Sequence, residues 1–129
     1  MSKTILVDAF NSFVIKDHGI FEEMYSLLEE YKNKKIIVTN ANDEQIIVLG
    51  LNDLPYETFT LKHNPEKTNP EYFKILLKQY TLKVEDVIYF EHNQEAARSA
   101  ESLGINTYYY DHEQKDLCKL KMFLDHNTN

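Results

Sequence analysis

The stretch Thr4-Ile5-Leu6-Val7-Asp8 near the start of the chain places a carboxylate directly after four β-branched or aliphatic residues. A run this short and this apolar predicts a strand that is buried on both faces, as in a parallel sheet. An acidic side chain at the end of a buried strand is costly unless it has a partner. The pattern therefore favours a site role for Asp8 over the simpler interpretation that it only ends the strand.

Strand and helix patterns alternate along the rest of the chain. Further strands are predicted at 36–39, 56–61, 87–90 and 105–110. Apolar residues recur every three or four positions between them and predict helices at 20–31, 42–49, 70–80, 94–103 and 114–125. Because parallel neighbours need helical crossovers, this alternation predicts a doubly wound, mainly parallel five-stranded sheet. We expect one α/β domain over 1–129, built as a three-layer α/β/α sandwich.

Composition excludes several classes of protein. The chain has 129 residues, 43% of them apolar, so it can bury a real core. Its net charge of −7 lacks the basic patch that nucleic acid or anionic lipid requires, so we expect neither partner. No run of the sequence approaches the length of a membrane span or a signal peptide. Cys118 is the single cysteine and is expected to be a buried, inert thiol in a cytoplasmic protein.

Three of the predicted strands end in polar residues, namely Asp8, Thr39 and Glu91. In an open α/β sheet, ligands bind beyond the carboxyl ends of the strands, where the strand order reverses. Lys67 lies just before a helix whose start, Asn69-Pro70-Glu71, belongs on the same side. Two carboxylates, a hydroxyl and an ammonium at one edge can hold a phosphoryl group or another anion, with or without a divalent cation.

Four segments, at 5–13, 36–40, 67–73 and 87–93, resemble in order and spacing the four motifs of the haloacid dehalogenase superfamily of aspartyl-nucleophile hydrolases. The resemblance implies that Asp8 is the nucleophile, that Thr39 hydrogen-bonds the phosphoryl group and that Lys67 neutralises both. It further implies a flap at 14–19 and a magnesium ion held by Asp8, the Phe10 carbonyl and Glu91. The substrate-binding residues expected with them are Phe10, Asn11 and Asn40.

The chain departs from the family pattern at two places. Phe10 stands where phosphatases of this family carry a second aspartate, their general acid and base, and such a group contributes about 10²–10⁴ in rate. Glu91 stands where aspartate is expected, and His92 where another acid often follows. Only 30 residues separate Asp8 from Thr39, and 27 separate Thr39 from Lys67, which is too few for the family's cap domains.

Three functional hypotheses follow. The leading one is a capless, phosphatase-like hydrolase with an incomplete catalytic set and weak or no turnover, acting on a small phosphorylated molecule. The alternative is a binding or assembly domain, a pseudoenzyme that has the fold without the chemistry and meets a protein partner. A metal-independent displacement of halide by Asp8 is a third, disfavoured because it needs an enclosed site. The five histidines show no metal-ligand spacing, so a zinc site is not expected.

Overall fold

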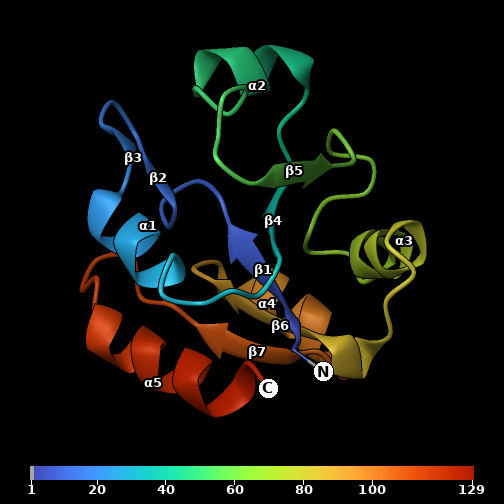
Figure 1. Ribbon diagram of the computed structural model, residues 1–129. Helices are drawn as coiled ribbons and strands as arrows, with labels where there is room; N and C mark the ends of the chain where they lie inside the picture. Colours follow the sequence, from blue (N-terminus) through green and yellow to red (C-terminus); the bar gives the residue numbers. More distant parts are fainter. Residues whose placement is uncertain (1) are drawn as a thin grey trace.

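The computed structural model describes residues 2–129 and is built on a five-stranded parallel sheet (Figure 1). The strand order is β5-β4-β1-β6-β7, and every neighbouring pair is parallel. The strands are β1 (Thr4–Asp8), β4 (Lys35–Thr39), β5 (Glu57–Thr60), β6 (Val87–Glu91) and β7 (Asn106–Tyr109). All five predicted strands are thus present, each within one or two residues of its expected bounds.

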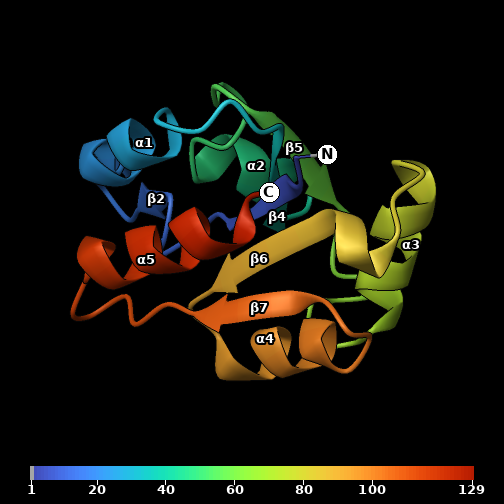
Figure 2. The same cartoon turned by 60° about the horizontal axis from the view of Figure 1, so that its bottom comes forward.

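Helices cover both faces of this sheet, which confirms the three-layer sandwich (Figures 1 and 2). Helices α1 (Glu22–Leu28) and α5 (Leu117–Asn127) pack on one face. Helices α3 (Glu71–Gln79) and α4 (Gln94–Glu101) pack on the other, and a 3₁₀ turn, η1 (Val84–Asp86), leads into β6. The short helix α2 (Asp43–Val48) lies beyond the end of β4, where it borders the pocket that Asp8 lines.

The central strand β1 is buried along its whole length, and its side chains alternate between two cores. Ile5 and Val7 join the core under α1 and α5, whereas Leu6 joins the core under α3. Each fully buried aliphatic side chain of this kind contributes about 1.5–3 kcal/mol to the free energy of folding. Burial on both faces is what the apolar run before Asp8 predicts.

Strand register brings the polar strand ends together. Residue Asp8 of β1 lies opposite Val38 of β4, and Val7 lies opposite Phe90 of β6. The strands β1, β4 and β6 therefore end within one residue of one another, and Asp8, Thr39 and Glu91 share one edge. The chain leaves β1 for β4 on one side and later returns to β6 on the other, which makes this edge a topological switch point.

A two-stranded hairpin follows β1, as the family resemblance implies. Strands β2 (Val14–Ile15) and β3 (Gly19–Ile20) are antiparallel and match the flap expected at 14–19. Between Thr39 and Lys67 the chain forms α2 and β5. No further domain is inserted at either place within residues 2–129.

The bounds of three helices, α1, α4 and α5, differ from the sequence prediction by two or more residues, and one side-chain expectation is wrong. Helix α1 ends at Leu28 because the backbone N–H groups of Glu30 and Tyr31 bond to carbonyls three residues back, which forms a tight turn. Helix α5 begins at Leu117 because Asp116 caps it. Cys118 follows Leu117 about a quarter turn round the helix, so its thiol is exposed rather than buried.

None of the helices within residues 2–129 has the length and apolar character that crossing a bilayer demands.

Candidate functional site

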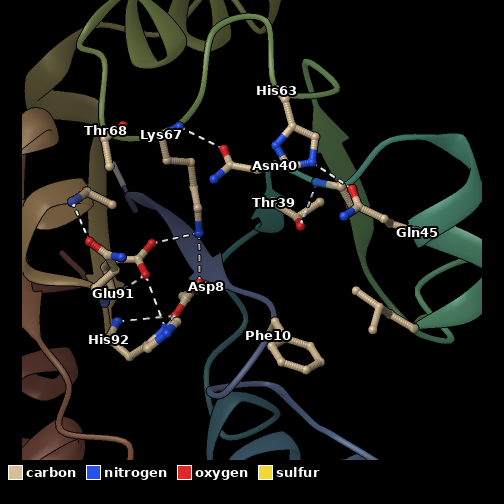
Figure 3. Close-up of a pocket in the computed structure, with 14 residues that line it drawn as sticks. Asp8, Phe10, Thr39, Asn40, Gln45, His63, Lys67, Thr68, Glu91 and His92 are labelled. Atoms are coloured by element: carbon tan, nitrogen blue, oxygen red, sulfur yellow. Dashed lines mark hydrogen bonds and ion pairs between the residues drawn. The ribbon is translucent and has the colours of Figure 1, made fainter.

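A pocket of about 210 Å³ opens at the carboxyl ends of β1, β4 and β6 (Figure 3). The sequence-predicted residues Asp8, Phe10, Thr39, Asn40, Lys67 and Glu91 all line it. They are joined there by Gln45 and Leu49 from the α2 region and by His63, His92 and Asn93. The fold therefore brings together nearly the whole predicted group, as expected for strand ends at one switch point.

Asp8 lies at the floor of the pocket with 1% of its surface exposed. Its Oδ1 accepts a hydrogen bond from Lys67 Nζ at 2.8 Å. Its Oδ2 accepts from Ser12 Oγ at 2.6 Å, from the His92 backbone N–H at 3.1 Å and from His92 Nδ1. Burial alone would raise the pKa of this carboxyl, but the Lys67 charge and His92 outweigh it and hold the pKa well below its ordinary value. Asp8 is therefore an ionised carboxylate.

Lys67 bridges the two carboxylates of the site. Its Nζ lies 2.8 Å from Asp8 Oδ1 and 2.7 Å from Glu91 Oε1, and the side chain is buried. Burial would lower the pKa of this ammonium, but the charges of Asp8 and Glu91 outweigh it and raise the pKa above its ordinary value. The Lys67 backbone N–H donates to Asn40 Oδ1 at 2.7 Å, so Asn40 helps to position this residue.

Glu91 is fully buried at the end of β6 and is held through both oxygens. Its Oε1 accepts from Lys67 and from the Tyr89 hydroxyl, and its Oε2 accepts from the Asn93 backbone N–H at 3.0 Å. Asn93 also caps α4 through Ala96 N–H. Glu91 and Asp8 both contact the Lys67 ammonium, so the two acids belong to one network of charged groups.

Thr39 faces the pocket at the end of β4, and its backbone is fixed by a buried tyrosine. The Tyr72 hydroxyl lies 2.8 Å from Thr39 O and 3.0 Å from Phe59 O, and it accepts from the Thr39 N–H at 3.1 Å. Thr39 Oγ1 accepts from Ala41 N–H at 3.2 Å, which leaves its hydroxyl proton free to be donated to a ligand. Burial raises the pKa of Tyr72, which therefore stays a neutral phenol.

The two flap-proximal residues differ in where they lie. The Phe10 ring is partly exposed and lies on the side of Asp8 away from Glu91 and His92 (Figure 3). Asn11 does not line the pocket: it has a φ of 67° and its backbone N–H bonds Val14 O at 2.8 Å, so it shapes the turn that carries Ser12. Asn11 thus acts on the backbone, in contrast to the expected contact with substrate.

Sequence reasoning missed three side chains of this site. Ser12 and His92 both contact Asp8, and only the position of His92 directly after Glu91 hinted at its place. On the opposite wall, His63 lies with Nε2 at 2.6 Å from Gln45 Oε1 and Nδ1 at 2.7 Å from Glu66 Oε2. Gln45 is held in turn by the capping box of α2, a local signal that placed the helix but not this contact.

Comparison with solved structures gives the fold a name. A haloacid dehalogenase family enzyme from Bacteroides thetaiotaomicron, an aspartate-to-alanine mutant in complex with magnesium and inorganic phosphate, superposes with a TM-score of 0.69 at 13% identity. The match covers 84% of this chain and 94% of that one. The chain has the haloacid dehalogenase fold.

Two further structures share this haloacid dehalogenase core. An uncharacterized protein from Corynebacterium glutamicum gives a TM-score of 0.64, and the core domain of a proposed phosphoglycolate phosphatase from Streptococcus pneumoniae gives 0.63. Both are 14% identical in sequence, and each match covers 97% of this chain and 96% of the other. No protein-family model matches the chain, and no curated protein matches it in sequence.

Asp8, Glu91 and His92 form a cluster of ligand-capable groups, with one atom of each lying within 4.8 Å of the others. The magnesium expected from the sequence would lie here, between Asp8 and Glu91. The same atoms are already engaged by protein donors, because each oxygen of both carboxylates accepts at least one hydrogen bond from a side chain or a backbone N–H. A cation could therefore bind these oxygens only by displacing the donors that now occupy them.

Proposed function

We propose that this pocket binds a phosphoryl group and is a phosphatase-like hydrolytic site with slow turnover. The observation that carries the proposal is the buried pair of Asp8 and Lys67, joined at 2.8 Å at the floor of an open pocket. A carboxylate kept ionised by a buried ammonium is a nucleophile aimed at an anionic group that the same ammonium can neutralise.

In the first step the Asp8 carboxylate attacks the phosphorus of a phosphate monoester. The new bond joins an Asp8 oxygen to phosphorus, and the bond from phosphorus to the leaving oxygen breaks with its electron pair. Lys67 neutralises charge on the phosphoryl oxygens, and the Thr39 hydroxyl donates a hydrogen bond to one of them. The second step is attack by water on the acyl phosphate, which restores Asp8 and releases phosphate.

Two features support slow turnover. Phe10 has no proton to give to the leaving oxygen and cannot take one from the attacking water, and a positioned acid or base contributes about 10²–10⁴ in rate. Asp8 also accepts several hydrogen bonds, and its lowered pKa makes it a weaker nucleophile. Substrates with good leaving groups, such as aryl phosphates, need the missing acid least.

Magnesium does not fit this arrangement as it stands. The ion prefers a nearly octahedral shell of oxygens and keeps several waters. Here Oδ2 of Asp8 accepts from Ser12 and twice from His92, and Oε2 of Glu91 accepts from Asn93 with His92 Nδ1 at 3.2 Å. A magnesium ion would have to displace these donors.

The test of the proposed function is hydrolysis of an aryl phosphate by the wild type and by Asp8→Asn. The wild type should release the phenol slowly, and Asp8→Asn should release none above background. Asp53→Asn is the matched control, because it makes the same change at an exposed loop residue. Activity that Asp8→Asn leaves unchanged would remove Asp8 from the role of nucleophile.

One observation favours the second candidate function, a binding or assembly domain. Ile47 and Val48 of α2, next to the pocket, are 69% and 75% exposed. These two adjacent apolar side chains offer a small contact surface for a protein partner beside the open pocket. Self-association through α2 would give a dimer in size-exclusion chromatography with light scattering, and Val48→Glu would return it to a monomer. A monomeric wild type that hydrolyses small phosphoesters would count against this candidate.

A further inference from the structure

The carboxylates of Asp8 and Glu91 are bridged twice, once by each of two nitrogen donors. Lys67 Nζ joins Oδ1 of Asp8 to Oε1 of Glu91, at 2.8 and 2.7 Å. His92 Nδ1 joins the other oxygens, Oδ2 of Asp8 and Oε2 of Glu91, the second at 3.2 Å. Figure 3 shows His92 below the pair and Lys67 above it. A bridging metal between two acids would hold the oxygens that His92 now holds.

Hydrogen-bond geometry defines the state of the His92 ring. Nδ1 faces two carboxylate oxygens, which only accept, so this nitrogen must carry a hydrogen. The groups that face the ring are Asp8 from β1, Glu91 from β6 and the His112 ring, whose centroid lies 5.0 Å away.

The donors around the two acids agree with this geometry. The Lys67 ammonium and the hydrogen on His92 Nδ1 already meet both carboxylates, so each acid is bridged to the other without any added ion. A divalent cation placed between Asp8 and Glu91 would instead face the Lys67 ammonium and the His92 ring across short distances. Buried like charges repel strongly in a medium of low dielectric constant.

We propose that the His92 ring takes the place of a bridging divalent cation between Asp8 and Glu91, so that the pocket binds a phosphoryl anion without metal. The part of this proposal that names the anion rests on the proposed function. His92 is a positioning residue here: it holds Asp8 and Glu91 in place, and Lys67 and Thr39 face the ligand.

The competing arrangement is a metal site in which His92 itself is a ligand. An imidazole nitrogen with two carboxylates suits zinc better than magnesium. A metal ligated by His92 would require Nδ1 to lose its hydrogen. The Nδ1 hydrogen of His92, which NMR can detect, therefore distinguishes the donating ring from the ligating ring.

The experiment is an amide ¹H–¹⁵N NMR titration of the wild type at neutral pH with magnesium chloride alone, and then with zinc chloride alone. We expect no saturable shifts at Asp8, Glu91 or His92 with either metal, and a His92 ring signal in which Nδ1 keeps its hydrogen. Saturable binding of magnesium that Glu91→Gln removes would overturn the proposal. Binding of zinc with loss of the Nδ1 hydrogen would overturn it in favour of the His92-ligated site.

The variant His92→Asp tests the same proposal in the opposite direction, by a gain of magnesium binding. His92→Asp removes the bridging ring and adds a third carboxylate, so magnesium affinity should rise at least about tenfold over the wild type, or about 1.4 kcal/mol. His126→Asp is the matched control on the exposed end of α5 and should leave magnesium affinity unchanged. A folded His92→Asp that binds magnesium no better than the wild type would contradict the proposed exchange of ring for ion.

A titration with inorganic phosphate, first with a chelator and then with magnesium, separates the proposed function from the proposed role of His92. Equal NMR shifts on adding phosphate in the two conditions support both proposals. Phosphate binding only with magnesium would overturn the role of His92 and leave the proposed function standing. No phosphate binding in either condition would count against the proposed function, whereas the metal titrations and the His92 ring signal would still decide the inference.

Discussion

Replacing Lys67 with methionine removes the ammonium that lies between Asp8 and Glu91 and keeps most of the side-chain length. Its ammonium lies 2.8 Å from Asp8 and 2.7 Å from Glu91, whose side chains are 1% and 0% exposed. Removing one partner of a buried ion pair costs about 3–5 kcal/mol, because the remaining charge stays buried and uncompensated. Since a domain of this size is stable by about 5–15 kcal/mol, the loss should be large but compatible with folding.

Urea denaturation followed by circular dichroism measures this loss for Lys67→Met against the wild type. Without the ammonium, the pKa of the Asp8 carboxyl rises, so the variant should bind a proton in mild acid and its deficit should shrink as the pH falls. Lys74→Met is the control, because the Lys74–Glu71 pair is more than half exposed and should change stability by less than about 1 kcal/mol. A deficit below about 1 kcal/mol for Lys67→Met, or one that does not vary with pH, would refute the account of the buried pair.

Three further predictions follow from the same contacts. Since folding raises the pKa of His92 from 6.5 to about 9, its contribution, on the order of 3 kcal/mol, is fully present below pH 6.5 and is lost as the pH rises through 9. Melting temperatures of the wild type should fall over that window, and those of His92→Asn should not. Phe10→Asp should raise aryl phosphatase activity, by at most about 10²–10⁴-fold, because the partly exposed ring lies beside Asp8; no gain in a folded variant would contradict the mechanism. Tyr72→Phe should lose about 1–3 kcal/mol by calorimetry, because the buried carbonyls of Thr39 and Phe59 lose a donor, and an unchanged melting temperature would count against this role.

The fold could be predicted because local pattern and topology agree. The apolar run of β1 required burial on both faces, and the strand–helix alternation then required a parallel sheet with its strand ends at one edge. That edge placed Asp8, Thr39 and Glu91 together without any knowledge of side-chain positions. Lys67 followed from the helix start behind it.

The contacts made by residues beyond the strand ends could not be predicted in the same way. His92 reaches Asp8 because of the turn between β6 and α4, and Ser12 reaches it because Asn11 takes a left-handed conformation. Such directions depend on backbone angles at single residues, which periodicity does not encode. The exposed Cys118 is a different case, because it lies off the face of α5 on which Leu120 and Leu124 are buried, and helical periodicity alone predicts its exposure.

The most direct test of the central claim, that Asp8 receives a phosphoryl group, is the intact mass of the protein after incubation with an aryl phosphate and an acid quench. Because the second step lacks its base, the acyl phosphate should accumulate. The wild type should gain the mass of one phosphoryl group, which peptide masses after digestion should assign to the peptide that contains Asp8, and Asp8→Asn should gain none. An unmodified wild type that hydrolyses the ester as fast as Asp8→Asn would contradict the claim.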